Sequence, residues 1–198
     1  MISNATAIAN KVLASHNTML WQFHSSLSRQ VALATSATNA DECRQNVAVC
    51  VLLSVSLVET FFNMFFRIVV SEVGFTQFSA QILQDFKNQV SLEYKIKEWP
   101  KLIFGKNIDF SQGMGQKFIQ LKNMRNWLMH FTSTFESFSF DNITVQGLAD
   151  ISKYEALNAR DAAEALTIAE GFIAELLKLR GVQPEHMPFQ LQFWLGKG

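Results

Sequence analysis

The stretch that decides the fold is VAVCVLLSVSLVETFFNMFFRIVV, residues 47–70. It is apolar over almost its whole length, yet it contains Glu59, Asn63 and Arg67. An ionised side chain at the centre of a lipid bilayer is costly, so these three residues argue against a membrane span. The stretch is therefore predicted to be a core helix of a soluble protein, and no membrane partner is expected.

A second long helix is predicted to precede this one. Between residues 6 and 37, apolar side chains recur mostly at steps of three and four or their sums, which indicates an amphipathic helix. The run from Asn39 to Glu42 resembles a capping box at the start of the next helix, which Gly74 is expected to end. Two long helices joined by so short a break should pack antiparallel.

The rest of the chain is predicted to form shorter elements. Further helices are expected at 79–90, 92–104, 116–131 and 158–180. Pro100 is expected to kink or end the second of these. Apolar residues alternate on both sides of Asp141 and Asn142, which predicts a small β-hairpin. The expected fold class is all-α, a helical bundle with two long antiparallel N-terminal helices, shorter helices and a small hairpin insert.

The composition predicts one folded domain. Apolar residues make up 48% and charged residues 17%, a balance too hydrophobic for a disordered chain. No internal repeat or Pro/Ser-rich linker divides the sequence, so residues 1–198 are interpreted as a single domain. The apolar segment 189–195 is too short to have its own core. Residues 181–198 are therefore expected to be a C-terminal tail that docks on this domain or on a partner subunit.

The charges are balanced over the whole chain but not along it. There are 17 basic and 17 acidic residues, so no global attraction to nucleic acid or to an anionic membrane is expected. Residues 85–130, however, contain eight Lys or Arg against four Asp or Glu. This local excess is either a modest phosphate-binding face or a solvated helical surface.

The cysteines and histidines give no sign of a disulfide or a metal site. Cys43 and Cys50 are separated by about 10 Å along one predicted helix, too far for a disulfide. Two unpaired thiols, and a start without the pattern of a signal peptide, predict a cytoplasmic protein. The four histidines have no zinc-binding spacing with the cysteines, so neither a metal nor another cofactor is expected: His16, His24, His130 and His186.

The candidate chemistry lies in KNMRNWLMHF, residues 122–131. On a helical projection Met124 belongs to the arc that faces the core. Arg125 falls within the same arc, where an unpaired charge would be expensive. Asn126 and His130 are four residues apart and share a face that flanks this arc. A lone histidine beside an apolar stripe is more often structural, and this spacing of arginine and histidine is common by chance.

The motif Arg-Asn-x-x-x-His, late in a helical bundle and after a long helix carrying LVETFFN at 57–63, resembles the HEPN domain family. The resemblance covers residues 5–180 approximately. It implies a compact helical bundle that acts as a metal-independent endoribonuclease. Members of the family commonly dimerise so that two copies of the motif face each other across a cleft. RNA is therefore the implied substrate and a homodimer the implied assembly.

The resemblance also assigns roles to residues. Arg125 and His130 match the catalytic pair, and Asn126 matches the polar residue that follows the arginine. Glu59 and Asn63 lie in the second helix, where many members have polar residues lining the site. Lys122, at the start of the motif run, joins them as a substrate-binding or supporting residue. The expected reaction is attack of an RNA 2′-hydroxyl on its own phosphate, with a histidine as base and an arginine on the phosphate.

Two interpretations of the polar residues in the second helix remain open. Glu59, Asn63 and Arg67 recur every four residues and form a stripe on an otherwise apolar helix. In the first interpretation the stripe faces the motif helix, and Glu59 pairs with Arg125. In the second, Glu59 and Arg67 pair within their own helix, bridged by Asn63.

The biological role is open as well. Toxin members silenced by nucleotide transfer from a partner have a tyrosine two residues after the histidine, where this chain has Thr132. An antitoxin partner of that kind is therefore in doubt. The first hypothesis is a ribonuclease of the defence or toxin type. The alternatives are a non-catalytic HEPN-like module that binds RNA or a protein partner, and an interaction protein that uses the tail around Phe193 and Trp194.

Overall fold

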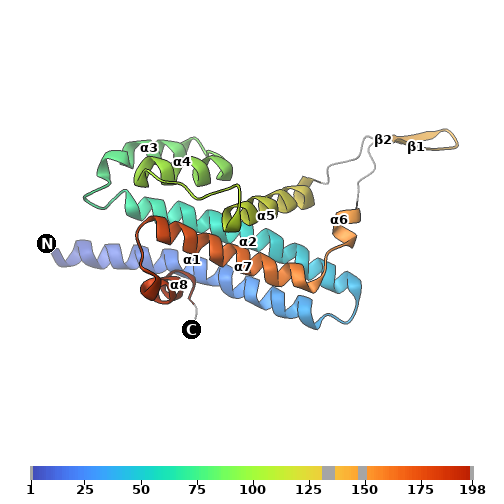
Figure 1. Ribbon diagram of the computed structural model, residues 1–198, viewed down its shortest axis with the longest axis horizontal. Helices are drawn as coiled ribbons and strands as arrows, with labels where there is room; N and C mark the ends of the chain where they lie inside the picture. The colour runs from blue at the N-terminus through green and yellow to red at the C-terminus, as the bar shows by residue number, and fades with distance from the viewer. Residues whose placement is uncertain (1, 131–136, 147–150, 197–198) are drawn as a thin grey trace.

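Three helices form the centre of the molecule. The computed structural model describes residues 2–130, 137–146 and 151–196 and is a helical bundle (Figure 1). Helix α1 (Ile2–Ser36) and helix α2 (Ala40–Val69) run antiparallel and pack along each other. Helix α7 (Ala159–Leu179) packs against both of them. The predicted all-α fold class is confirmed.

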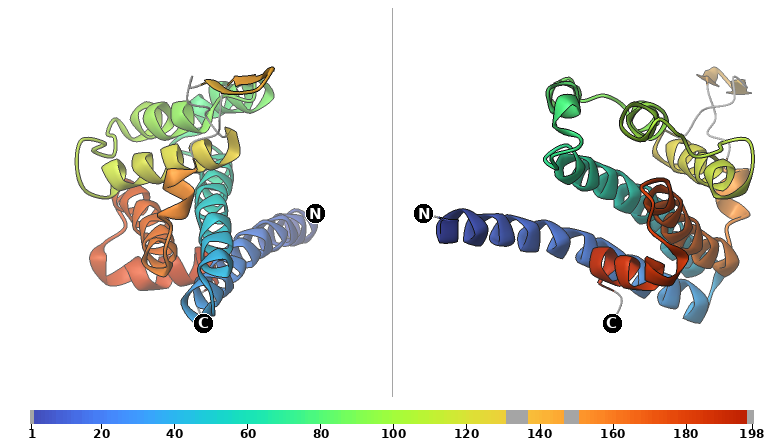
Figure 2. Two further views of the ribbon diagram at one scale, coloured as in Figure 1. Left: turned by 90° about the vertical axis from the view of Figure 1, so that its right-hand side faces the viewer. Right: turned by 60° about the vertical axis from the view of Figure 1, so that its left-hand side comes forward.

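The shorter elements cover this centre from two sides. They are η1 (Thr76–Phe78), α3 (Ser79–Lys87), α4 (Leu92–Phe104), α5 (Gly113–His130), α6 (Ser152–Glu155), η2 (Pro184–His186) and α8 (Met187–Leu195). Figure 2 shows α3 and α4 on one side of α2, with α1 and α8 on the other. Helix α5 packs against α2 and α7.

The core is built around the phenylalanines of α2. Phe61, Phe62, Phe65 and Phe66 are fully buried. All four contact an aromatic ring of a different helix: Phe61 and Phe65 with Trp194 of α8 at 5.1 and 5.9 Å between ring centroids, Phe62 with Phe172 of α7 at 5.9 Å, and Phe66 with Trp99 of α4 at 5.4 Å. Each such pair contributes about 0.5–1.5 kcal/mol beyond its buried area. Helix α2 therefore holds the surrounding helices in place.

Helix α2 is also where a membrane span has to be considered. Among the described residues it is the only helix long and apolar enough to cross a bilayer, judged by length and composition. However, 56% of its most apolar window is buried by other parts of the fold. The core helix of a soluble protein passes the same test of length and composition, and burial of more than half of this window is consistent with such a helix.

Helix α2 begins as predicted but ends earlier. The Asn39 side chain accepts a hydrogen bond from the Glu42 backbone N–H at 2.9 Å, as an N-cap should. The helix ends at Val69, five residues before Gly74. Beyond that end, the backbone N–H and the hydroxyl of Ser71 both donate to the carbonyl of Ile68. These local bonds replace the next helical turn and explain the early end.

Pro100 does not end helix α4. The helix continues to Phe104 and is capped by Gly105, whose φ of 65° lies in the left-handed region that glycine adopts without steric cost. Proline removes one backbone hydrogen bond from the helix interior. Pro100 and its neighbour Trp99 are buried, so packing of this part of α4 compensates for the missing bond.

Two strands and the C-terminal helix complete the fold. Strands β1 (Ser137–Phe140) and β2 (Ile143–Gln146) pair antiparallel and lie away from the helices (Figure 1). Helix α8 packs against α1 and α7. Its Trp194 and Leu195 are buried, and the Trp21 indole N–H of α1 donates to the Phe193 carbonyl at 3.1 Å. The described part of the C-terminal segment is therefore docked on its own chain.

Candidate functional site

Helix α5 borders a cleft that we call the motif cleft. It is lined by Glu59 of α2, by residues 89–93 at the start of α4, and by Lys122, Arg125 and Asn126 of α5. Its volume is about 390 Å³. Ligand sites in proteins usually have volumes of about 300–1,000 Å³, so the motif cleft has room for part of a nucleotide chain. Four of the six predicted site residues thus border the same cleft.

Arg125 is half-buried at this cleft. Its guanidinium donates to the Asn126 side-chain oxygen at 3.0 Å. No carboxylate among the described residues forms an ion pair with it. A guanidinium has five N–H donors, and only this one is used by another described side chain. With respect to the described residues, Arg125 and Asn126 therefore keep hydrogen-bonding groups that are available to an anionic ligand.

Lys122 is a buried cation in the same cleft. Only 8% of the residue is exposed, and its ammonium donates to Glu93 at 2.7 Å. Glu93 also accepts from Lys97 at 2.7 Å, one turn further along α4. Hydrogen bonds from Lys122 and then Lys97, together with the charges of both lysines, lower the pKa of Glu93 to about 2. Glu93 is therefore fully ionised at neutral pH.

Glu59 has a partner that neither interpretation predicted. Its carboxylate accepts from the ammonium of Lys95 in α4 at 3.0 Å, so the predicted pair with Arg125 is wrong. The alternative pair with Arg67 is also wrong, because the Arg67 guanidinium lies over the Phe86 ring, 4.2 Å from its centroid. The reason is the packing of α4 against α2, which brings the buried ammonium of Lys95 to the carboxylate.

Asn63 does not bridge these charges either. It lies one helical turn after Glu59 on α2, and its buried side-chain oxygen accepts no hydrogen bond from the described residues. It is not among the residues that line the motif cleft. Asn63 is thus the one predicted supporting residue that the described structure does not bring to the cleft.

His130 is the last residue of α5, and its side chain lies outside the described residues. The backbone of α5 places it one turn beyond Asn126. Residues four apart lie on the same face of a helix. The backbone therefore keeps His130 in line with an amide that lines the motif cleft. Thr132 lies outside the described residues.

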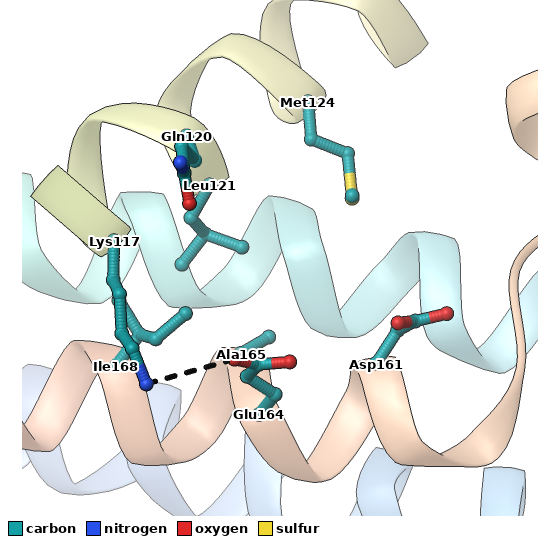
Figure 3. A pocket seen from close by; sticks show the side chains of 8 residues that line it. All are labelled: Lys117, Gln120, Leu121, Met124, Asp161, Glu164, Ala165 and Ile168. Carbon is teal, nitrogen blue, oxygen red and sulfur yellow. Dashed lines mark ion pairs between the residues drawn. The ribbon is translucent and has the colours of Figure 1, made fainter.

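The other flank of α5 borders a groove toward α7, which we call the α5–α7 groove (Figure 3). It has a volume of about 130 Å³, with Leu121 and Ile168 among the side chains that line it. Met124 points into it and is 36% exposed, although the helical projection predicted a place in the core. Trp127 of the same helix, in contrast, is buried, with 8% of the residue exposed. The projection assumed one core face, whereas α5 contacts both α2 and α7.

No metal-binding group is found within residues 2–130, 137–146 and 151–196 when clusters of three or more His, Cys, Asp or Glu are considered. His24 of α1 instead pairs with Glu170 of α7 at 2.7 Å. Both cysteines are free thiols. Burial raises the pKa of Cys50 to about 11, so this thiol stays protonated and is a poor nucleophile at neutral pH.

Sequence reasoning missed the contribution of α4 to the cleft. Ser91 caps this helix by accepting from the Tyr94 backbone N–H at 3.2 Å, which a cap-like serine before an apolar pattern could have indicated. Gln89, two residues earlier, has a φ of 50°, a left-handed conformation that is uncommon for a residue with a side chain. The position of Glu93 opposite Lys122 depends on how α4 and α5 pack, and no local pattern reports it.

Comparisons of this chain with known protein families, with curated proteins and with solved structures found no match. The resemblance to the HEPN family is therefore neither supported nor contradicted by relatives. The case for a function depends on the chemistry of the motif cleft.

Proposed function

We propose that this protein is a HEPN-type, metal-independent endoribonuclease that acts as a homodimer in the cytoplasm. Arg125, Asn126 and His130 would form its reaction site. The observation that carries the proposal is the guanidinium of Arg125, which has no carboxylate partner among the described residues and borders a cleft of about 390 Å³. Lys122 adds a buried positive charge to the same cleft.

The reaction follows from these groups. The ribose 2′-oxygen bonds to phosphorus as the bond from phosphorus to the 5′-oxygen breaks. His130 takes the proton of the 2′-hydroxyl, and histidine suits this role because its charge changes near neutral pH. Arg125 stabilises the negative charge that gathers on the phosphate oxygens, with its forked donors. The products carry a 2′,3′-cyclic phosphate and a 5′-hydroxyl.

The dimer is part of the proposal because the reaction needs both a base and an acid. The departing 5′-oxygen has to receive a proton, and one motif supplies a single imidazole. A protonated His130 of the partner subunit would supply that proton. The second copy would thereby complete the site. A role in defence or in a toxin–antitoxin system is the biological context proposed for this activity.

The alternative is a non-catalytic module that binds RNA or a protein. The observation in its favour is the charge balance of the motif cleft, where Glu59 and Glu93 match the charges of Lys122 and Arg125. A site that is neutral overall attracts RNA weakly. The two functions differ in whether RNA is cut, and a single assay separates them.

The test is incubation of purified protein with total RNA in EDTA. Wild type should cleave and leave 2′,3′-cyclic phosphate ends, and His130→Ala should not cleave. His186→Ala is the matched control, because His186 is an exposed histidine in η2 and should be dispensable. Inactivity of all three proteins would support the binding module. Equal activity of all three would exclude His130 as the catalytic base.

The composite site has its own test. Wild type is mixed with an equal amount of His130→Ala and the subunits are allowed to exchange. If each reaction needs both imidazoles of a dimer, only dimers of two wild-type chains are active. The mixture then has about one quarter of the activity of pure wild type at the same total protein concentration. If one chain suffices, about one half remains, and the homodimeric site is wrong.

A further inference from the structure

The pair of Lys122 and Glu93 is uneven in its burial. The Lys122 side chain is 10% exposed, whereas that of Glu93 is 48% exposed. A buried ammonium is thus neutralised by a carboxylate that is about half exposed to solvent. Leaving a buried charge without a partner is unfavourable, so an anion beside Lys122 is favoured. Nothing requires that anion to be Glu93.

We propose that Lys122 is a phosphate-binding position of the motif cleft and that the Glu93 carboxylate occupies it until a phosphodiester displaces it. This inference rests on the proposed function, because it names a second contact for the same RNA ligand. Carboxylates and phosphates both bind ammonium groups through charge-assisted hydrogen bonds, so one can replace the other. Glu93 would then act as an internal competitor of the ligand.

Glu93 can leave without losing all of its ion pairs. Its other partner, Lys97, is four residues away on the same helix, and the side chain of Lys97 is 43% exposed. A displaced Glu93 would still be paired and hydrated. Because its pKa is about 2, Glu93 remains charged throughout the neutral range, so displacement depends on the anion rather than on pH.

The pair of Glu59 and Lys95 shows what a permanent pair looks like. Lys95 is buried to a similar degree, with 8% of its side chain exposed, and Glu59 is 32% exposed. Lys95 is the only cation that pairs with Glu59 among the described residues, so departure of Glu59 would leave both charges alone. We therefore assign the exchange to Glu93 alone.

The position of Lys122 suits a nucleic-acid chain. It lies three residues before Arg125 on α5, and side chains at that spacing are about 5–6 Å apart at their Cβ atoms. Both residues line the motif cleft. Without Glu93 the lining would carry two cations and one anion, Glu59. A phosphodiester that displaces Glu93 therefore enters a cleft with a net positive charge.

The experiment measures binding of a fluorescently labelled, mixed-sequence single-stranded RNA over a series of salt concentrations. Every protein carries His130→Ala so that the RNA is not cut. Glu93→Gln is compared with Glu98→Gln, which removes the same charge from an exposed position of α4 outside the cleft. Glu93→Gln should bind about 5–10-fold more tightly and should steepen the salt dependence by about 0.7 in log–log slope, as one added phosphate contact does.

Two further variants make the result independent of how well Glu93→Gln folds. Lys122→Met leaves Glu93 paired with Lys97 and should weaken RNA binding, whereas Lys117→Met, an exposed control on α5, should not. Adding Lys122→Met to Glu93→Gln should abolish the gain in affinity. The proposal is overturned if Glu93→Gln and Glu98→Gln behave alike, or if Lys122→Met and Lys117→Met behave alike.

The same measurements separate this inference from the proposed function. A gain in affinity with Glu93→Gln, combined with failure of the wild-type protein to cut RNA, keeps the phosphate position and removes the nuclease. Cleavage by wild type without a gain in RNA affinity for Glu93→Gln keeps the nuclease and removes the phosphate position. Single-stranded DNA of the same sequence should show the same gain, because the contact is to the phosphate. Competition by inorganic phosphate alone would show that Lys122 binds a free anion rather than a nucleic-acid chain.

Discussion

The two flanks of α5 border hollows of different chemistry. On the side of α4, the motif cleft contains two acids and two bases, among them the buried Lys122. On the side of α7, the α5–α7 groove has an apolar floor, and the ion pair across it, between Lys117 and Glu164, spans 3.9 Å with both side chains about half exposed. Charged side chains are thus buried at the motif cleft, whereas the ion pair at the α5–α7 groove is exposed to solvent.

This difference between the two flanks indicates which of them binds a ligand. Burying an ion pair carries a desolvation cost that often exceeds the gain, and apolar residues of the same volume would serve stability as well. The fold bears this cost at the motif cleft and not at the α5–α7 groove. Arg125 adds a cation without a carboxylate partner on the same flank. The buried charges therefore favour the motif cleft as the binding site, and the following predictions test that contrast.

The largest expected effect lies on the apolar flank. Phe118 is fully buried and stacks on Phe172 of α7, with 4.2 Å between ring centroids. Phe118→Ala should lower the free energy of unfolding by about 3–5 kcal/mol, because it removes the ring and leaves a cavity. Urea denaturation measures this change. A loss below about 1 kcal/mol would mean that this flank is not the packed one.

The next effect concerns catalysis. Arg125→Ala should reduce the rate of RNA cleavage by about 100–1,000-fold, the usual loss when one stabilising donor to a developing anion is removed. The free energy of unfolding should change by only about 1 kcal/mol or less, since the guanidinium has no charged partner among the described residues. Asn123→Ala, an exposed residue on the other flank, is the control and should cleave normally. Similar rates for both variants would contradict the assignment of Arg125.

A smaller effect is expected at the permanent ion pair. Glu59→Gln keeps the shape of the side chain but leaves the ammonium of Lys95 without its counter-charge. The expected loss of unfolding free energy is about 2 kcal/mol, below the full value for a buried pair because Glu59 is a third exposed. Glu98→Gln, on the exposed side of α4, should be neutral. If both variants are neutral, the contrast between the two flanks loses its energetic basis.

The pH dependence should show a weaker effect of Glu93. Its pKa falls from 4.5 to about 2 in the folded protein, so its contribution to stability is present above pH 4.5 and is lost as the pH falls toward 2. Because the side chain is about half exposed, solvent screening limits this contribution to about 1 kcal/mol or less. Wild type and Glu93→Gln should therefore differ in unfolding free energy at pH 6 and converge near pH 2. A constant difference would exclude the ion pair as its cause.

The sequence was sufficient where the signal is local. Helix α4 has the predicted bounds, Leu92–Phe104. Helix α7 begins directly after Asn158, where the predicted helix 158–180 starts, and the Asn158 side chain caps it by accepting from the Arg160 N–H at 3.1 Å. Helical periodicity and capping depend on residues within about one or two turns of each other. Such patterns can be read from the chain without knowing the fold.

The sequence was insufficient where the signal depends on packing. Both predicted partners of Glu59 came from α2 and α5, whereas the actual partner, Lys95, comes from α4. The periodicity of a helix shows which of its faces is apolar, but not which neighbouring helix that face contacts. The same limit explains Met124, which the helical projection placed in the core but which lies at the α5–α7 groove. The motif residues Arg125 and Asn126 could be predicted as neighbours, but the carboxylates around them could not.

The smallest effect is expected at the pair across the α5–α7 groove. Lys117→Met and Glu164→Gln each break an ion pair whose side chains are 49% and 47% exposed. Exposed pairs contribute about 0–1 kcal/mol, so each variant should unfold within about 0.5 kcal/mol of wild type. Neither should change RNA cleavage. If Lys117→Met weakened RNA binding as much as Lys122→Met, the cation that matters would lie on the flank without buried charge, and the ligand would have to be moved to the α5–α7 groove.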